Sequence, residues 1–137
     1  MSGDIIKVSR NTANAPKSTI STQSVAFSHY NNISAQLAVD PKTSELVAGG
    51  IKEQAEQCLK NIKAIVESLD HVMNDIVKVN IQLKNIADLN AVNQAYTRFF
   101  NSELPARTTV GVSAIAMGAL VQIDAVVSNC EGIPPEA

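Results

Sequence analysis

Two neighbouring segments with different hydrophobic periods constrain the fold of this 137-residue chain most. Over residues 51–69, apolar side chains recur at helical spacing on one stripe, while lysines and glutamates occupy the other side. This pattern predicts an amphipathic helix. Over residues 75–84, the sequence D-I-V-K-V-N-I-Q-L-K alternates apolar and polar side chains and predicts a half-buried strand. Together they indicate an α+β domain, and the chain length fits one domain over residues 1–137.

The other segments complete the order β-β-β-α-β-α-β-β. Residues 30–32 are predicted to hold a hairpin turn, and residues 40–43 a second turn. Gly49–Gly50 breaks the chain before the first helix, and a second helix begins near Ala87. One sheet with both helices on a single face is the economical packing. The predicted strands are residues 5–8, 24–29, 33–39, 75–84, 107–112 and 120–127, followed by a tail over 128–137.

The face of the sheet away from the helices is predicted to carry polar side chains. Within the strand at 107–112, alternation separates Arg107 and Thr109 from Thr108 and Val110. A face of mixed character is either solvated or shared with other subunits, and periodicity leaves both possibilities open. The residues expected on it are Asn80, Gln82, Arg107, Thr109, Gln122 and Asp124.

The slightly acidic net charge of the chain argues against partners that are bound through their phosphates. The chain has 11 Lys and Arg against 13 Asp and Glu, a net charge of −2. Binding to nucleic acid through phosphates needs a basic excess, and 4% aromatic residues supply few stacking platforms, so nucleic-acid partners are not expected. No segment has the apolar length of a signal peptide or a membrane span. We therefore expect a cytoplasmic protein with no membrane partner.

No cofactor motif occurs, and the possible metal ligands are scattered. The chain lacks G-x-G-x-x-G, a P-loop, H-E-x-x-H and G-x-S-x-G, and its two Cys and two His have no metal-ligand spacing. Neither a cofactor nor a metal is predicted. Other candidates are predicted to be structural: His29 in a solvated turn, His71 at a helix end, Cys58, Tyr96 and Phe99 in the core, and Cys130 in the tail.

Arg107 is the residue best suited to chemistry. It follows Pro105–Ala106 at the start of a strand, where a rigid element presents a planar set of N–H donors to a small carboxylate. The alternative is an ordinary surface ion pair. Asp124 carries a similar ambiguity between a general base and a polar residue of the sheet face.

Several short motifs, in order, resemble the Rid/YjgF family, which includes reactive-intermediate deaminase A and L-PSP endoribonucleases. P-A-R-T-T-V at 105–110 followed by G-A-L-V-Q-I-D-A at 118–125 resembles the C-terminal signature of the family, and the motifs are specific to it only when taken together. The resemblance covers residues 14–127. The other motifs are N-A-P at 14–16, S-A-Q at 34–36, D-P-K-T at 40–43, the helix at 53–66, I-V-K-V at 76–79 and V-N-Q-A-Y at 92–96.

The resemblance implies a chorismate-mutase-like fold that assembles as a homotrimer with ligand sites between subunits. It implies a small 2-imino or 2-keto acid as ligand, with its carboxylate on Arg107 and further contact from the Thr109 N–H. It also implies that backbone groups around Ser34 and Ala35 line the cleft and that Asn93 shapes it.

The chain departs from the family pattern at the position where a carboxylate would assist hydrolysis as a general acid or base. The family's Glu in the last strand corresponds to Gln122, whose amide can orient a water but does not accept a proton. Losing general acid–base help slows a reaction by roughly 10²–10⁴-fold. The family's Tyr after Asn-Ala-Pro corresponds to Ser21 or Thr22, its Gly to Ala35 and its Cys to Thr109.

Three functions remain open on the sequence. The first is a deaminase that hydrolyses small 2-imino acids with Arg107 and Gln122 as catalytic residues. The second is a non-catalytic regulator that binds small carboxylates, which the change to Gln122 favours. The third is an L-PSP-type endoribonuclease, which the acidic charge and scarce aromatic residues make the weakest of the three.

Overall fold

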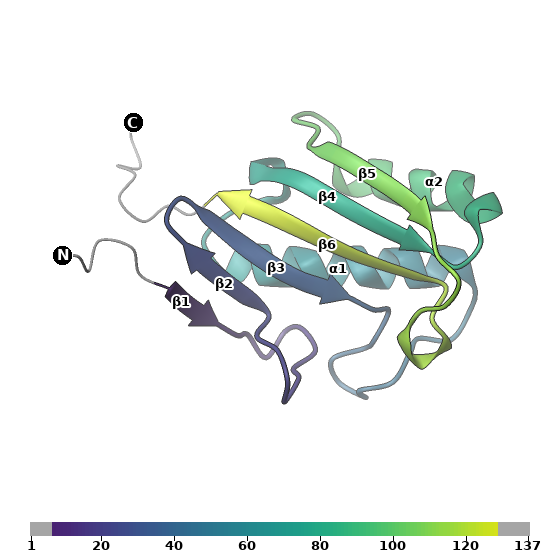
Figure 1. Cartoon of the computed structure of the whole chain (residues 1–137), viewed down its shortest axis with the longest axis horizontal. Coiled ribbons are helices and arrows are strands. Elements are labelled where there is room, and N and C mark those ends of the chain that lie inside the picture. Colours follow the sequence, from purple (N-terminus) through teal and green to yellow (C-terminus); the bar gives the residue numbers. More distant parts are fainter. Residues whose placement is uncertain (1–6, 129–137) are drawn as a thin grey trace.

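The chain folds into two layers, a sheet and a pair of helices that cover one of its faces (Figure 1). The computed structural model describes residues 7–128. Its helices are α1 (Ile51–Ser68) and α2 (Leu89–Phe99). Its strands are β1 (Lys7–Arg10), β2 (Ser24–Phe27), β3 (Tyr30–Gln36), β4 (Ile76–Leu83), β5 (Ala106–Gly111) and β6 (Val121–Ser128).

The sheet has the strand order β1-β2-β3-β6-β4-β5. Strands β4 and β5 are parallel, and the other neighbours are antiparallel. Both helices lie behind the sheet in the view of Figure 1. The predicted element order and the placement of both helices on one face are therefore confirmed. No helix within residues 7–128 combines the length and apolarity needed to cross a bilayer.

Helix α1 begins at a turn that only glycine fits. Gly49 has φ +109°, and a Cβ there would lie 2.6 Å from the Glu53 side chain. Glu53 reaches back from the first turn, and its Oε1 accepts the Gly50 N–H at 2.9 Å. Backbone hydrogen bonds from the Glu53 and Gly50 N–H groups lower the pKa of this carboxyl. The charged form thus stabilises the helix start.

The core lies between α1 and the central strands. The alternation predicted for 75–84 is present, since Val79, Ile81 and Leu83 are buried and Asn80 and Gln82 are not. Cys58 and Tyr96 are buried as predicted. Phe99 is only partly buried, and the neighbouring Phe100 fills the core instead. Together these side chains form one continuous apolar cluster.

The first hairpin differs from the sequence prediction. Phe27 pairs with Tyr30, so the turn is Ser28–His29, and residues 30–32 belong to β3. Ser28 adopts φ +64°, which suits a tight hairpin. Asn31, predicted in the turn, is buried and its Nδ2 donates to the Ser128 carbonyl at 3.2 Å. The predicted third strand is accordingly three residues too late, and β1 extends to Arg10 rather than ending at residue 8.

Strand β5 also corrects the predicted sheet faces. Arg107 pairs with Val79 and Thr109 with Ile81, and both partners are buried beneath the helices. Paired residues share a face, so Arg107 and Thr109 lie on the helix side and not on the open face. Thr108 and Val110 occupy the open face instead, beside Asn80 and Gln82.

Candidate functional site

Arg107 lies on an edge strand and points toward α2. Its Nη2 donates to Asn93 Oδ1 at 2.6 Å, and its Nε donates to Thr109 Oγ1 at 2.8 Å. Its Cζ lies 4.6 Å from the centroid of the Tyr96 ring. Asn93 and Tyr96 are three residues apart on α2, so one face of that helix presents both. These four residues form the guanidinium cluster.

The ring beneath the guanidinium is itself held firmly. Tyr96 is 6% exposed, and its centroid lies 4.5 Å from that of Phe100. Burial raises the pKa of Tyr96, although the Arg107 charge opposes the rise. A neutral phenol ring therefore offers its face to the cation, a contact worth about 0.5–2 kcal/mol.

The positive charge of Arg107 is not neutralised by the described part of the chain. No Asp or Glu among residues 7–128 forms an ion pair with Arg107. Two of its five N–H donors are used within those residues, both by neutral acceptors. A half-buried guanidinium with free donors and no acid is suited to a small anion, and its planar donors suit a carboxylate.

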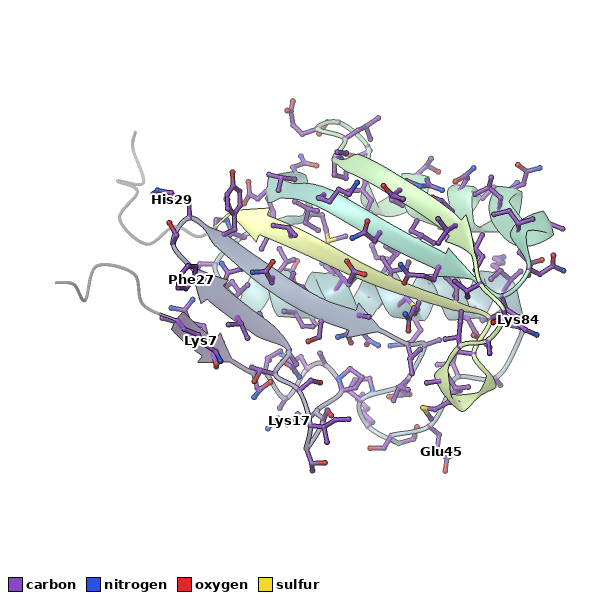
Figure 2. All side chains as sticks on the ribbon, in the orientation of Figure 1. Lys7, Lys17, Phe27, His29, Glu45 and Lys84 are labelled. Atoms are coloured by element: carbon purple, nitrogen blue, oxygen red, sulfur yellow. The ribbon has the colours of Figure 1, made fainter. Side chains whose placement is uncertain are left out.

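A separate hollow of about 760 Å³ lies beside the end of β3. Ser21, Ser34 and Ala35 line it, as do Ala116 and Met117 from the turn before β6. Arg107, Asn93, Thr109 and Gln122 do not line it. Figure 2 labels Lys17 in the loop before β2 and Glu45 in the loop after β3, and both loops lie at the same end of the molecule.

One buried side chain fixes the wall of this hollow. Gln23 Nε2 donates to the carbonyls of Thr12, Ala15 and Pro16 at 2.9–3.0 Å, and Gln23 Oε1 accepts the Thr12 N–H at 2.6 Å. These bonds tie residues 12–16 to the start of β2. The loop therefore has a defined shape without regular secondary structure.

Ser34 and Ala35 occupy an irregular part of β3. The register shifts between Ile33 and Gln36, which leaves Ala35 exposed. The Ser34 hydroxyl donates to the Thr22 carbonyl at 2.5 Å, and the Ser34 N–H donates to the Gln23 carbonyl at 2.9 Å. Ser34 thus joins the loop to the sheet, while Ala35 lines the hollow.

Gln122 lies on the open face of the sheet, away from the guanidinium cluster. It pairs with Gln82, whose Oε1 is buried and has no hydrogen-bond partner within residues 7–128. Asp124, one pleat along, accepts a hydrogen bond from Asn80 Nδ2 at 2.8 Å. The open face therefore carries a polar row, as predicted, but one made without Arg107 and Thr109.

The structure divides the predicted site residues into three places. Arg107, Asn93 and Thr109 converge, Ser21, Ser34 and Ala35 share the hollow, and Gln122 stands alone on the open face. Sequence reasoning assigned Tyr96 only to the core, although its spacing from Asn93 was a usable signal. It did not single out Gln23, whose role depends on contacts with a distant loop.

The other candidates have structural positions. His29 projects from the tip of the β2–β3 hairpin (Figure 2). His71 Nδ1 lies 2.8 Å from Asp75 Oδ2 just beyond α1. Burial raises the pKa of the Cys58 thiol to about 12, and Cys130 lies outside the described residues. Within residues 7–128 no three His, Cys, Asp or Glu side chains are grouped to hold a metal ion.

Comparison with known proteins gives this arrangement a context. The model of the family described as Endoribonuclease L-PSP matches residues 12–129. The chain belongs to this family, the Rid/YjgF family. As a Rid/YjgF chain it shares its fold with a Rid-family protein of unknown function from Yersinia pestis, with a TM-score of 0.87 and 35% identity. That likeness covers 90% of this chain and 99% of the other.

Relatives of this Rid/YjgF chain carry two kinds of name. A RutC family protein of Pyrococcus horikoshii is 39% identical over 116 residues, which cover 84% of this chain and 92% of the relative. A human protein named 2-iminobutanoate/2-iminopropanoate deaminase is 36% identical over 105 residues, 77% of each chain. A protein that is 36% identical to this chain is thus named as a deaminase.

Proposed function

We propose that this Rid/YjgF chain is a deaminase that hydrolyses small 2-imino acids. Water adds to the carbon of the protonated imine, the resulting carbinolamine loses its amine, and the products are a 2-keto acid and ammonium. The observation that carries the proposal is the half-buried guanidinium of Arg107, which has free N–H donors and forms no ion pair within residues 7–128. The deaminase names of relatives support the same reaction.

In this proposal Arg107 binds the carboxylate of the substrate. The fixed positive charge holds the acid end, so the imine carbon is presented at a set distance from the cluster. Asn93 and Thr109 keep the guanidinium in place, and the Thr109 N–H is a further candidate donor. The binding step requires no proton transfer by the protein.

The site is completed by a second copy of the chain in a homotrimer. Arg107 and Gln122 lie on opposite faces of one sheet, so the sheet separates them and one small ligand cannot touch both in a single chain. The buried Gln82 Oε1, without a partner in residues 7–128, supports contact of the open face with another copy. Ser21, Ser34, Ala35 and Gln122 would then come from the neighbour.

Gln122 orients the attacking water in this scheme. An amide can accept a hydrogen bond from the water, but it cannot take its proton at neutral pH. The proton released on addition therefore leaves through solvent or to the departing amine. Turnover is expected to be slower than with a carboxylate at this position.

The same amide supports a second candidate function, a non-catalytic binder of small carboxylates. It keeps Arg107 as the anchor and drops the hydrolytic step. An endoribonuclease has less support, because the chain is acidic overall and has no His pair in the guanidinium cluster or the hollow.

An assay of imine hydrolysis tests the proposal. An amino-acid oxidase with catalase generates the imino acid from 2-aminobutanoate, and semicarbazide traps whatever the protein has not hydrolysed. We expect the wild-type chain to lower the amount of trapped imine and Arg107→Ala not to. If the two behave alike while calorimetry shows that only the wild type binds 2-oxobutanoate, the binder replaces the deaminase.

A further inference from the structure

We propose that the Thr109 hydroxyl and the Tyr96 ring are positioning groups that make Arg107 receive a carboxylate at its Nη1 end rather than along its Nε side. The inference rests on the proposed function, since it concerns how the same guanidinium holds the acid. It assigns the Thr109 side chain a role separate from that of its N–H.

A guanidinium can bind a carboxylate with two parallel hydrogen bonds in two ways. Side-on binding uses Nε–H and one Nη–H, whereas end-on binding uses one hydrogen from each Nη. In this chain Nε already donates to Thr109 Oγ1 at 2.8 Å. The side-on arrangement therefore lacks one of its two donors.

The donors that remain all lie toward the end of the side chain. Nη2 gives one hydrogen to Asn93 Oδ1 at 2.6 Å, and Nη1 makes no hydrogen bond within residues 7–128. Both Nη1 hydrogens and one Nη2 hydrogen are thus available. Nη1 and Nη2 therefore each keep a hydrogen for the ligand, and these are the two nitrogens that end-on binding uses.

The Tyr96 ring restricts the remaining motion of the guanidinium. Two hydrogen bonds fix the group within its plane, and the ring 4.6 Å from Cζ limits its tilt. The ring cannot yield easily, because it is buried and packs on Phe100. The guanidinium of Arg107 is thus oriented before the ligand binds, which reduces the conformational entropy lost on binding.

Thr109 is the residue that tests this idea most cleanly. It lies two residues beyond Arg107 on the same face of an edge strand and is only partly buried, so an isosteric change should not disturb folding. Thr109→Val keeps the shape and removes the acceptor, and Thr109→Ser restores the hydroxyl. Thr97→Val on the exposed surface of α2 is a matched loss of a hydroxyl outside the guanidinium cluster.

The binding experiment uses calorimetry with 2-oxobutanoate and the imine assay on the same samples. We expect Thr109→Val to raise Kd and KM about fivefold to tenfold with kcat within about twofold, and Thr109→Ser and Thr97→Val to match wild type. Thr109→Val values within twofold of wild type would overturn the positioning role. So would a loss in Thr109→Ser equal to that in Thr109→Val.

A measurement independent of turnover separates this inference from the proposed function. The side-chain Nε–H signal of Arg107, assigned with Arg107→Ala, should resist solvent exchange in wild type and Thr109→Ser and lose that protection in Thr109→Val. Unchanged protection in Thr109→Val refutes the positioning role even if the wild type is an active deaminase. If the wild type neither binds 2-oxobutanoate nor hydrolyses the imine, both proposals are wrong.

Discussion

Arg107 and Gln122 lie on opposite faces of the same sheet. Arg107 pairs with the buried Val79 on the helix side, and Gln122 pairs with Gln82 on the open side. A ligand held by the guanidinium can therefore meet an amide of this kind only from another copy of the chain. This relationship sets the first two predictions.

Activity should reappear when two inactive variants assemble together. Arg107→Ala removes the anchor, and Ala35→Trp fills the hollow, so each variant alone should be inactive. In a trimer refolded from an equal mixture, about a quarter of the sites combine an intact Arg107 with an intact hollow from a neighbour. The imine assay should then show about a quarter of wild-type activity. Mixing without refolding is the control, and no recovery after refolding would rule out a shared site.

Gln122→Glu should increase the rate of imine hydrolysis. A carboxylate can take a proton from the attacking water, so we expect a rise of about 10- to 100-fold in initial rate. The gain should fade below about pH 4.3, where a glutamate becomes protonated. Gln82→Glu makes the same change one strand away on the open face and should bring no comparable gain. Equal rates for Gln122→Glu and wild type would argue against a water at this side chain.

Arg107→Lys should weaken ligand binding although it keeps the positive charge. An ammonium cannot form the planar two-point contact, so we expect KM and the Kd for 2-oxobutanoate to rise about tenfold or more. Arg98→Lys, on the surface where Arg98 pairs with Glu56, is the control and should leave both constants unchanged. If Arg107→Lys binds as tightly as wild type, charge alone anchors the ligand.

Asp75 should make the stability of the fold depend on pH at the acidic end. Burial opposes the shift, but the Val72 N–H and His71 together lower the pKa of Asp75 below its usual 3.8. A carboxyl with a lowered folded-state pKa stabilises the fold above its unfolded pKa and stops doing so as pH falls through the folded value. The urea midpoint of Asp75→Asn should thus lie below that of wild type at pH 7, and the gap should begin to close as pH falls below about 4.

Glu103→Gln, at an exposed position, controls for general charge effects in that experiment. Its midpoint should follow that of wild type over the same pH range. A constant gap between Asp75→Asn and wild type from about pH 7 to about pH 3, on both sides of the usual carboxyl pKa, would show that the aspartate acts through its shape and not its charge.

The orientation of an element could be predicted from the sequence where the two faces of that element differ in polarity. Strand β4 alternates buried Val79 and Ile81 with Asn80 and Gln82, so its faces could be assigned from the pattern alone. Strand β5 lies at the edge of the sheet and has polar side chains on both faces, with Arg107 and Thr109 on one and Thr108 on the other. The alternation separates the residues of β5 into two faces but does not show which face is turned toward the helices. Only the pairing with β4 shows that.

Long-range contacts account for the rest of what the sequence did not reveal. Asparagine is common in turns, yet the side-chain amide of Asn31 donates a hydrogen bond to the carbonyl of Ser128, 97 positions away. The hollow depends on Gln23 bonding a loop 7 to 11 residues earlier. Neither contact leaves a periodic trace in the chain, because each depends on one side chain and on distant backbone groups.

The bonds of Gln23 and Ser34 bear on how such proteins diversify. Residues 17–22 run between the Pro16 carbonyl, held by Gln23, and the Thr22 carbonyl, held by Ser34. Gln23 directly precedes β2 and Ser34 lies in β3, so both anchors survive if the span between them is rewritten, shortened or lengthened. Evolution can therefore exchange the lining of the hollow, and with it the molecules that the proposed site would admit, while the sheet that carries Arg107 is inherited unchanged.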